Sequence, residues 1–180
     1  MRNHSKIAET PGISLLIKDY LNDKESVAKF YHRKLSYDTL LEQSKEKLSV
    51  YPHRKELVEE LTQQLRDLDL SEKQQENLHK LSLNSTVTIT TGHQLNLMTG
   101  PLYFIYKILH TIKLCDSMNQ QQKEIFFVPV FWMATEDHDF EEINHFYFKN
   151  KKTEWQGEHQ DFVGELSTTG LKDILSDFYE

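Results

Sequence analysis

Cysteine is nearly absent from this sequence of 180 residues, in which Cys115 stands alone. A single cysteine excludes an intramolecular disulfide framework and is typical of a reducing compartment, so we expect a cytoplasmic protein. We interpret Cys115 as a small buried apolar residue. Because the N-terminus has no apolar core of the signal-peptide type, and no run approaches the roughly 20 apolar residues of a membrane helix, we expect no membrane span.

Positive charge is also scarce. Lys and Arg together number 21 against 28 Asp and Glu, which gives a formal net charge of −7. A nucleic-acid-binding protein needs a basic face, and no cluster of Lys and Arg is large enough to supply one. We therefore expect no nucleic-acid partner.

Glycine and proline are missing from most of the N-terminal half. Residues 13–91 contain no glycine and, apart from Pro52, no proline, which favours helix throughout. Ser71 and Gln74 form a candidate capping box for a helix ending near Leu83. We predict two to four amphipathic helices within a helical region of residues 1–85, with solvated charged faces and apolar faces that cover a sheet or each other.

The pattern changes at Thr86. Residues 86–90 alternate as a short strand does, and Gly92 permits a sharp turn or a positive φ. A helix is predicted from Pro101, as its first residue, to about Ser117 or Met118, with Thr99 or Gly100 as the N-cap. Apolar residues at helical spacing support it, and they are Leu102, Ile105, Tyr106, Leu109 and Ile112.

A second strand is predicted at residues 124–132, which are apolar and rich in β-branched and aromatic side chains. Pro129 within it removes a ladder donor, so this strand is expected to lie at an edge or to be irregular. Strand, helix and strand form a βαβ unit with a right-handed crossover. Because parallel strands end at the same edge of a sheet, we expect the loops after Thr91 and Met133 to face one cleft.

Less regular sequence follows the second strand. We predict a third strand near residues 145–148, a turn at 149–152 and a helix beginning at Leu171. The fold class is therefore α/β, with an incomplete parallel sheet after a helical region. Residues 86–180 are expected to be the first part of a larger domain.

Both loops carry groups capable of chemistry. Asp137, His138 and Asp139 place two carboxylates around an imidazole, which suits general acid–base catalysis. The same residues, with Glu141, Glu142 and His145, could instead ligate a metal, or simply provide an acidic first turn of a helix.

In the first loop, His93 and Gln94 follow the strand and precede a helix N-terminus, which suits an anion. The spacing matches neither a Walker loop nor the glycine-rich dinucleotide fingerprint. Tyr103 and Lys107 lie four residues apart, facing the cleft or packing as half-buried groups.

The two segments T-T-G-H-Q-L-N-L-M-T-G-P-L-Y-F-I-Y-K and V-P-V-F-W-M-A-T-E-D-H-D-F-E-E-I-N-H resemble those of the bacillithiol biosynthesis cysteine-adding enzymes, the BshC family. The resemblance implies a Rossmann-like core and a ligase that joins cysteine to the amine of glucosaminyl malate, the last step of bacillithiol biosynthesis. It also implies a full-length homodimer formed through a C-terminal coiled coil. Amide formation itself needs an activated carboxyl, most simply a phosphate or adenylate from ATP, and we assign no metal. Because family members are far longer, we expect this fragment alone to be inactive.

The resemblance and the chemistry together define the candidate site. Its catalytic residues are His93, at a position where the family commonly has Gln, and Asp137, His138 and Asp139. Its substrate-binding residues are Gly92, Gln94, Thr99, Gly100, Tyr103 and Lys107. Two alternatives stay open: a metal-dependent hydrolase using the triplet 137–139, and a non-enzymatic helical interaction module.

Overall fold

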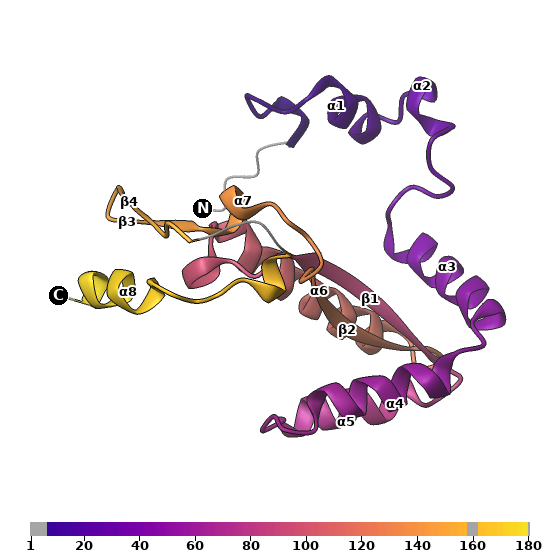
Figure 1. Ribbon diagram of the computed structural model, residues 1–180. Coiled ribbons are helices and arrows are strands. Elements are labelled where there is room, and N and C mark those ends of the chain that lie inside the picture. The colour runs from indigo at the N-terminus through magenta and orange to yellow at the C-terminus, as the bar shows by residue number, and fades with distance from the viewer. Residues whose placement is uncertain (1–6, 158–161, 180) are drawn as a thin grey trace. The chain divides into compact units, whose positions relative to one another are not determined.

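The computed structural model describes residues 7–157 and 162–179, and the chain divides into two compact units, Met1–Glu46 and Lys47–Glu180 (Figure 1). The first unit is helical. Its elements are a short 3-10 helix Ile7–Glu9, α1 Leu15–Leu21, α2 Glu25–Ala28 and most of α3 Tyr37–Val50. Ser14 caps α1, and its hydroxyl accepts the N–H of Ile17.

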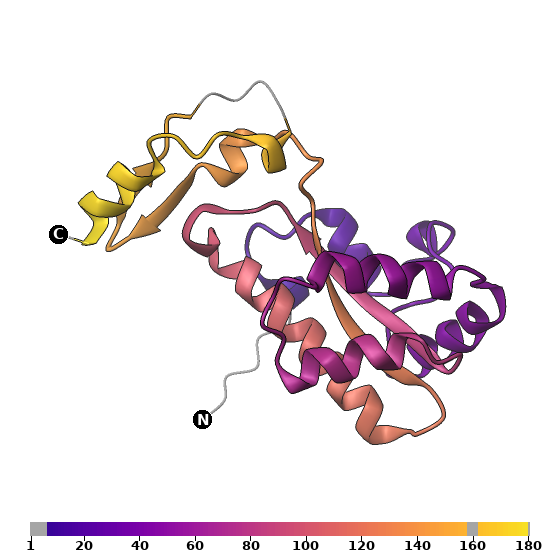
Figure 2. The same cartoon turned by 60° about the horizontal axis from the view of Figure 1, so that its bottom comes forward.

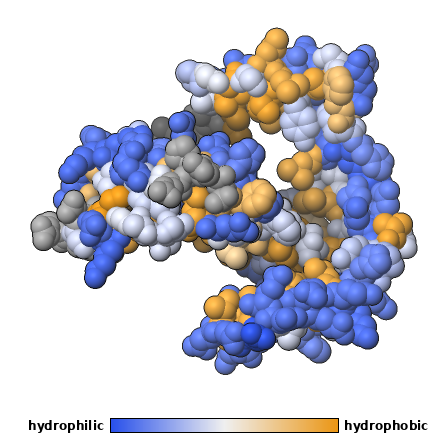
Figure 3. Space-filling view, viewed as in Figure 1, coloured by the Kyte–Doolittle hydropathy of each residue, from blue (hydrophilic) through white to orange (hydrophobic). Residues whose placement is uncertain are grey.

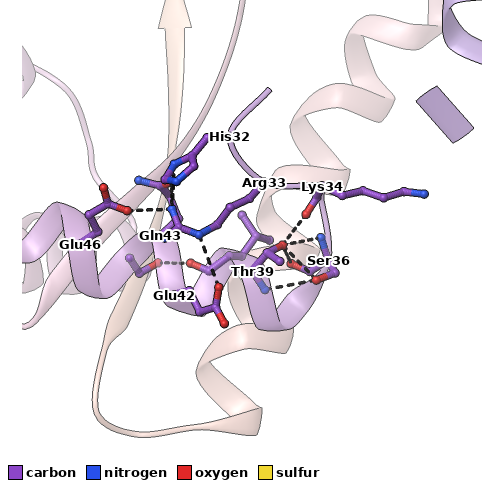
Figure 4. A network of polar contacts seen from close by, with 10 residues as sticks. His32, Arg33, Lys34, Ser36, Thr39, Glu42, Gln43 and Glu46 are labelled. Atoms are coloured by element: carbon purple, nitrogen blue, oxygen red, sulfur yellow. Dashed lines mark hydrogen bonds and ion pairs between the residues drawn. The ribbon is translucent and has the colours of Figure 1, made fainter. Parts of the chain in front are cut away.

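Polar contacts join the loop before α3 to that helix (Figure 4). The guanidinium of Arg33 donates to Gln43 Oε1 at 2.8 Å and to Glu46 Oε2 at 2.7 Å. Thr39 Oγ1 donates to the carbonyl of Lys34 at 2.6 Å. These contacts fix the chain direction into α3 with little apolar burial.

Apolar side chains are conspicuous on the surface of the first unit. Leu15 is 73% exposed and Phe30 is 76% exposed, and apolar residues gather over α1 at the top of Figure 3. In the described part of this unit, Val27 is the one buried hydrophobic residue. Within its own unit, α1 therefore leaves most of its apolar side chains uncovered.

Five α-helices precede the first strand in the described residues, more than the predicted two to four. The last two are α4 Arg54–Leu65 and α5 Glu72–Leu81. The extra breaks follow from local backbone geometry, since Asp23 has a φ of 56° and ends α1. The predicted capping box is confirmed: Ser71 Oγ accepts the N–H of Gln74, and Gln74 Oε1 accepts the N–H of Ser71 at 2.9 Å.

The βαβ unit is confirmed in the second unit (Figure 2). Its elements are β1 Thr86–His93, α6 Leu102–Gln121 and β2 Phe126–Met133. The strands pair in parallel from Thr86 opposite Phe126 to His93 opposite Met133. Both carboxyl ends therefore lie at one edge, as the sequence predicts.

Gly92 differs from its prediction. It lies within β1 opposite Trp132 and not in a turn, and it is not among the residues with positive φ. A Cβ at this position would lie 3.0 Å from the carbonyl oxygen of Trp132 and 3.1 Å from its Cβ. Glycine is needed here for close approach of the strands and not for a turn.

Helix α6 begins one residue later than predicted, because Pro101 is the N-cap and not the first helical residue, and it ends three or four residues later. The face toward the strands carries the buried Cys115 and Met118, and the ring of Phe104 packs on Phe131 at 5.5 Å. The apolar stripe that predicts the helix is the opposite, exposed face, which includes Leu102 and Leu109. A helix that is apolar on both sides is typical of one covered on both sides.

The predicted third strand exists but does not join the parallel sheet. β3 His145–Phe148 and β4 Lys151–Glu154 pair as an antiparallel hairpin. Its two-residue turn, Lys149 and Asn150, has φ of 46° and 65°, which suits the right-handed twist of a hairpin. The hairpin lies with the remaining elements, away from the β1–β2 pair (Figures 1 and 2).

The second unit also contains a 3-10 helix, Leu97–Thr99, between β1 and α6. Apart from the hairpin, its other short elements after β2 are α7 Phe140–Ile143, a 3-10 helix Val163–Glu165 and α8 Leu171–Tyr179, the last as predicted. A small core joins them, made of Phe140, Ile143, Trp155 and Val163. Leu97, from the loop after β1, packs against this core and ties it to the βαβ unit. Within the described ranges, every helix is too short or too polar to span a bilayer.

The burial of Cys115 leads to a prediction about alkaline pH. Burial, and then the charge of Asp116, raise the pKa of the thiol from 9.0 to about 12. The folded state therefore favours the protonated thiol, and its contribution to stability is complete below pH 9 and lost as the pH rises from about 9 to about 12. We expect Cys115→Ala to lack this part of the decline, so that its deficit relative to wild type shrinks by roughly 1 kcal/mol from pH 8.5 to pH 10.

The measurement is urea unfolding of both proteins across that pH range. Iodoacetamide should alkylate Cys115 in the unfolded chain and leave it unmodified in the folded chain at pH 8. A deficit that is constant with pH, or rapid alkylation of the folded chain, would contradict the burial argument.

Candidate functional site

A cluster of polar side chains lies where β1 ends. His93 is the last residue of β1, Asn96 lies in the loop that follows, Tyr103 is in the first turn of α6, and Glu142 is in α7. The loop returns sharply because Gly100 has a φ of 56°. A Cβ on Gly100 would lie 2.5 Å from Asn96 Oδ1, so glycine is required both for the turn and for the position of Asn96.

Glu142 is the centre of this cluster. One carboxylate oxygen lies 3.3 Å from His93 Nε2 and accepts the hydroxyl of Tyr103 at 3.4 Å. The other accepts a short hydrogen bond from the side-chain amide of Gln94. A single carboxylate on α7 thus contacts groups from β1, from the loop after it and from α6. It joins the βαβ unit to the small core around α7.

Both ring nitrogens of His93 have partners within the cluster. Nδ1 lies 2.8 Å from Asn96 Nδ2, a donor, and 3.2 Å from the backbone carbonyl oxygen of Gln94, an acceptor, so these contacts fit either tautomer of the imidazole. Nε2 lies 2.8 Å from the hydroxyl oxygen of Tyr103. Polar contacts thus run without a break from His93 to Tyr103 to Glu142.

Tyr103 and Glu142 are the accessible members of this series. Tyr103 is 47% exposed, whereas His93 is buried and uses both ring nitrogens within the cluster. Partial burial of the phenol, the charge of Glu142 and the hydrogen bond to it all raise the pKa of Tyr103 above 10.0. The phenol therefore keeps its proton at neutral pH, and the arrangement presents a hydroxyl and a carboxylate to a ligand.

Two further oxygen atoms favour a ligand that donates hydrogen bonds. Gln94 is only 2% exposed, and its Oε1 has no hydrogen-bond partner among the described residues. The same holds for Asn96 Oδ1. A buried acceptor without a partner is costly. Both atoms have almost no exposed surface, so a ligand would reach them only after a local opening of the cluster. Together with Glu142, these atoms make the cluster rich in acceptors, which suits an amine or a hydroxyl group.

The triplet after β2 is arranged differently. Asp139 caps α7, where its carboxylate accepts the N–H of Glu142 at 3.2 Å. Asp137 accepts the N–H of His138 at 2.8 Å, and the His138 side chain is 84% exposed. In the described part of the chain, no side-chain hydrogen bond connects the triplet to His93. Asp139 is thus the N-cap of a helix whose first turn carries Glu141 and Glu142, so an acidic helix start, one of the interpretations of the sequence, is present.

The remaining candidates lie around the cluster. Lys107 Nζ lies 5.7 Å from the centre of the Tyr103 ring, so these two residues share a face of α6 as the spacing predicts. Thr99 is exposed and has a φ of 67°.

Two members of the cluster were not predicted as such. Sequence reasoning missed Asn96, and it considered Glu142 only as a possible metal ligand. The described residues contain no group of three or more His, Cys, Asp or Glu side chains that could hold a metal ion, so the hydrolase alternative is not supported.

These observations define an α/β domain of the Rossmann-like class, with a polar site at the carboxyl end of its parallel strand pair. Comparison with known families identifies it further. The model of the N-terminal Rossmann-like domain of BshC, a family of bacillithiol biosynthesis, matches residues 2–180. The chain belongs to the BshC family.

Curated relatives of the chain share the name "Putative cysteine ligase BshC". The protein from Flavobacterium psychrophilum is 46% identical over 168 residues, which cover 92% of this chain and 32% of that protein. The relative from Flavobacterium johnsoniae is 46% identical over 164 residues, covering 90% and 31%. The relative from Christiangramia forsetii is 44% identical over 176 residues, covering 94% and 33%. The chain thus spans about a third of the length of these relatives.

Proposed function

We propose that the complete protein is a ligase that joins cysteine through an amide bond to the amine of glucosaminyl malate, the last step of bacillithiol biosynthesis. Membership of the BshC family supports the reaction, since the relatives are named as cysteine ligases. The observation that carries the role of this domain is the acceptor-rich cluster around Glu142. We propose that it binds the amine-bearing substrate.

Each member of the cluster then has a chemical task. Amide formation requires a neutral amine at the moment of attack, so a proton must leave the substrate nitrogen. The carboxylate of Glu142 accepts from that nitrogen, and the hydroxyl of Tyr103 orients it. His93 and Gln94 hold the carboxylate in place, while Asp137 and His138, at the end of the neighbouring strand, are proposed to contact the same substrate.

ATP is the proposed source of carboxyl activation, which amide formation in water requires. The atoms of the cluster do not fit its phosphate groups, because Glu142, Gln94 Oε1 and Asn96 Oδ1 are all acceptors. Lys107 is the nearby cation, and it lies over the ring of Tyr103. The cluster is therefore proposed to bind the amine of the substrate and not ATP.

Two further features of the complete protein are proposals. We propose a cytoplasmic enzyme, because Cys115 is a free thiol on the buried face of α6 and needs no oxidising compartment. We propose a homodimer for the full-length protein, which sedimentation of that protein would test. The 180 residues alone are expected to be inactive.

The decisive experiment is a thiol profile of a strain that lacks this gene, complemented with the complete gene. Bacillithiol should return, and glucosaminyl malate should fall to its wild-type level. If the precursor persists although the complete protein is expressed and folded, the proposed ligase activity is wrong. A helical interaction module would leave the profile of the deletion strain unchanged.

A further inference from the structure

The two outer edges of the β1–β2 pair differ in a way that bears on how the sheet continues. Phe126 donates its N–H to Ser85 O at 2.9 Å, and Ala134 donates to His93 O at 3.1 Å. Since the backbone groups of a strand point to alternate sides, even-numbered residues of β2 face β1, and odd-numbered residues of β2 face away from it. In β1 the odd-numbered residues face β2, and the even-numbered residues form the outer edge.

The outer edge of β2 is closed. The side-chain amide of Asn119, on α6, bonds to both backbone groups of Phe127, accepting its N–H at 2.8 Å and donating to its carbonyl at 2.9 Å. The next residue on this edge is Pro129, which has no N–H to donate. Two successive positions are therefore unable to pair with a further strand, and edge strands commonly carry such features.

The outer edge of β1 is open beyond its first residue. Thr86 is satisfied, because its N–H bonds to Leu83 O at 3.1 Å and its carbonyl accepts Arg54 Nη2 at 2.9 Å. The backbone groups of the next three outward positions have no hydrogen-bond partner within the described residues. These positions are Thr88, Thr90 and Gly92. Thr88 and Thr90 are also exposed.

We infer that the sheet of the complete protein grows from the β1 edge, where a strand from the part of the chain that follows this domain pairs with residues 88–92. The matched family model is that of an N-terminal domain, and about two thirds of each close relative lies outside the match, so ample chain follows. Isolated two-stranded sheets are weak, and most sheets contain four to six strands. β2 is then the terminal strand of the sheet, and β1 is an interior strand.

This order has a consequence for the site. An interior β1 places His93 between two neighbouring strands, with β2 on one side and the added strand on the other. The inference does not depend on the proposed ligase activity, because it rests on backbone hydrogen bonding alone.

The test is hydrogen–deuterium exchange of the complete wild-type protein, resolved to single amides by electron-transfer fragmentation. An interior strand protects every amide, so Thr88 and Thr90 should exchange at least ~100-fold more slowly than the outward Phe131 of β2. An edge strand protects alternate amides only. Fast exchange at Thr88 and Thr90, or slow exchange at Phe131, would overturn the inference.

Two controls identify the occupant and the closed edge. If a second copy of the protein covers β1, protection of Thr90 will decrease on dilution below the dimer dissociation constant, and the inference of an intramolecular strand fails. Protection that is independent of concentration supports it. Asn119→Ala should speed exchange of the Phe127 amide at least ~10-fold and leave Thr90 unchanged, since it frees only the β2 edge. An unchanged Phe127 amide would show that Asn119 does not close that edge.

Discussion

Replacing Glu142 with glutamine in the complete protein is expected to lower the rate of ligation about 100-fold, at the lower end of the range for loss of a positioned acid–base group. The substitution keeps the size of the side chain and removes its charge. Tyr103 and Gln94 both donate to this carboxylate, and an amide nitrogen would meet one of these donors with another donor. The measurement is the steady-state rate of product formation by the purified complete protein.

Glu141→Gln is the matched control. Glu141 is the preceding residue of α7 and makes no hydrogen bond to the His93 cluster in the described structure, so its rate should stay within about twofold of wild type. Tyr103→Phe should show part of the loss, and Tyr106→Phe, on the exposed side of the same helix, should not. A Glu142→Gln protein with the wild-type rate and an unchanged melting temperature would remove the cluster from the proposed mechanism.

A double variant shows whether Tyr103 and Glu142 act together or independently. If Tyr103 and Glu142 act on the same proton, the double variant Tyr103→Phe and Glu142→Gln should be little slower than the slower single variant. If each binds a different part of the substrate, the two losses in activation free energy should add. The first result is expected, because the two groups are joined by a hydrogen bond.

The βαβ unit could be predicted because its signals are local. Alternating Thr and β-branched residues predict β1, a nearly continuous apolar run predicts β2, and their separation leaves room for a helix. Boundaries were less well predicted. Gly92 looks like a turn in sequence because glycine permits a positive φ, but here it is needed for the close approach of Trp132 across the strand pair. Only the partner strand reveals that need.

The candidate site was predicted only where its residues lie close together in sequence. His93, Gln94 and Tyr103 are near one another in sequence, and their loop and helix bring them together. Glu142 lies 48 residues beyond Gln94, next to an equally acidic Glu141, and no local pattern separates the two. The side on which each carboxylate lies is decided by the packing of α7 through Phe140 and Ile143, which is a tertiary contact.

Likewise, the third strand could be located but not assigned to a sheet. A run of His and aromatic residues at 145–148 predicts extended backbone, and pairing depends on the two-residue turn that follows. Lys149 and Asn150 both take positive φ, which closes an antiparallel hairpin. Lys is a poor residue for that conformation, so the sequence carries only the weaker signal of Asn150.

Replacing Phe127 with alanine is expected to destabilise the chain by about 3–5 kcal/mol, the usual cost of emptying a buried phenylalanine site. Phe127 is 1% exposed. It lies in β2 on the side that faces α6, where Ile108 and Thr111 border the same space. Asn119 fixes the backbone of this residue from α6, so the helix cannot easily move in to fill the cavity. Urea unfolding followed by circular dichroism measures the loss.

The matched control is Phe30→Ala, the same change at a side chain that is 76% exposed, which should cost less than about 0.5 kcal/mol. Phe127→Leu should recover more than half of the loss, because it restores most of the apolar volume. A loss below about 1 kcal/mol for Phe127→Ala would contradict the packing of α6 on β2. A loss of equal size at Phe30 would instead show that the exposed apolar surface of the first unit is covered in solution.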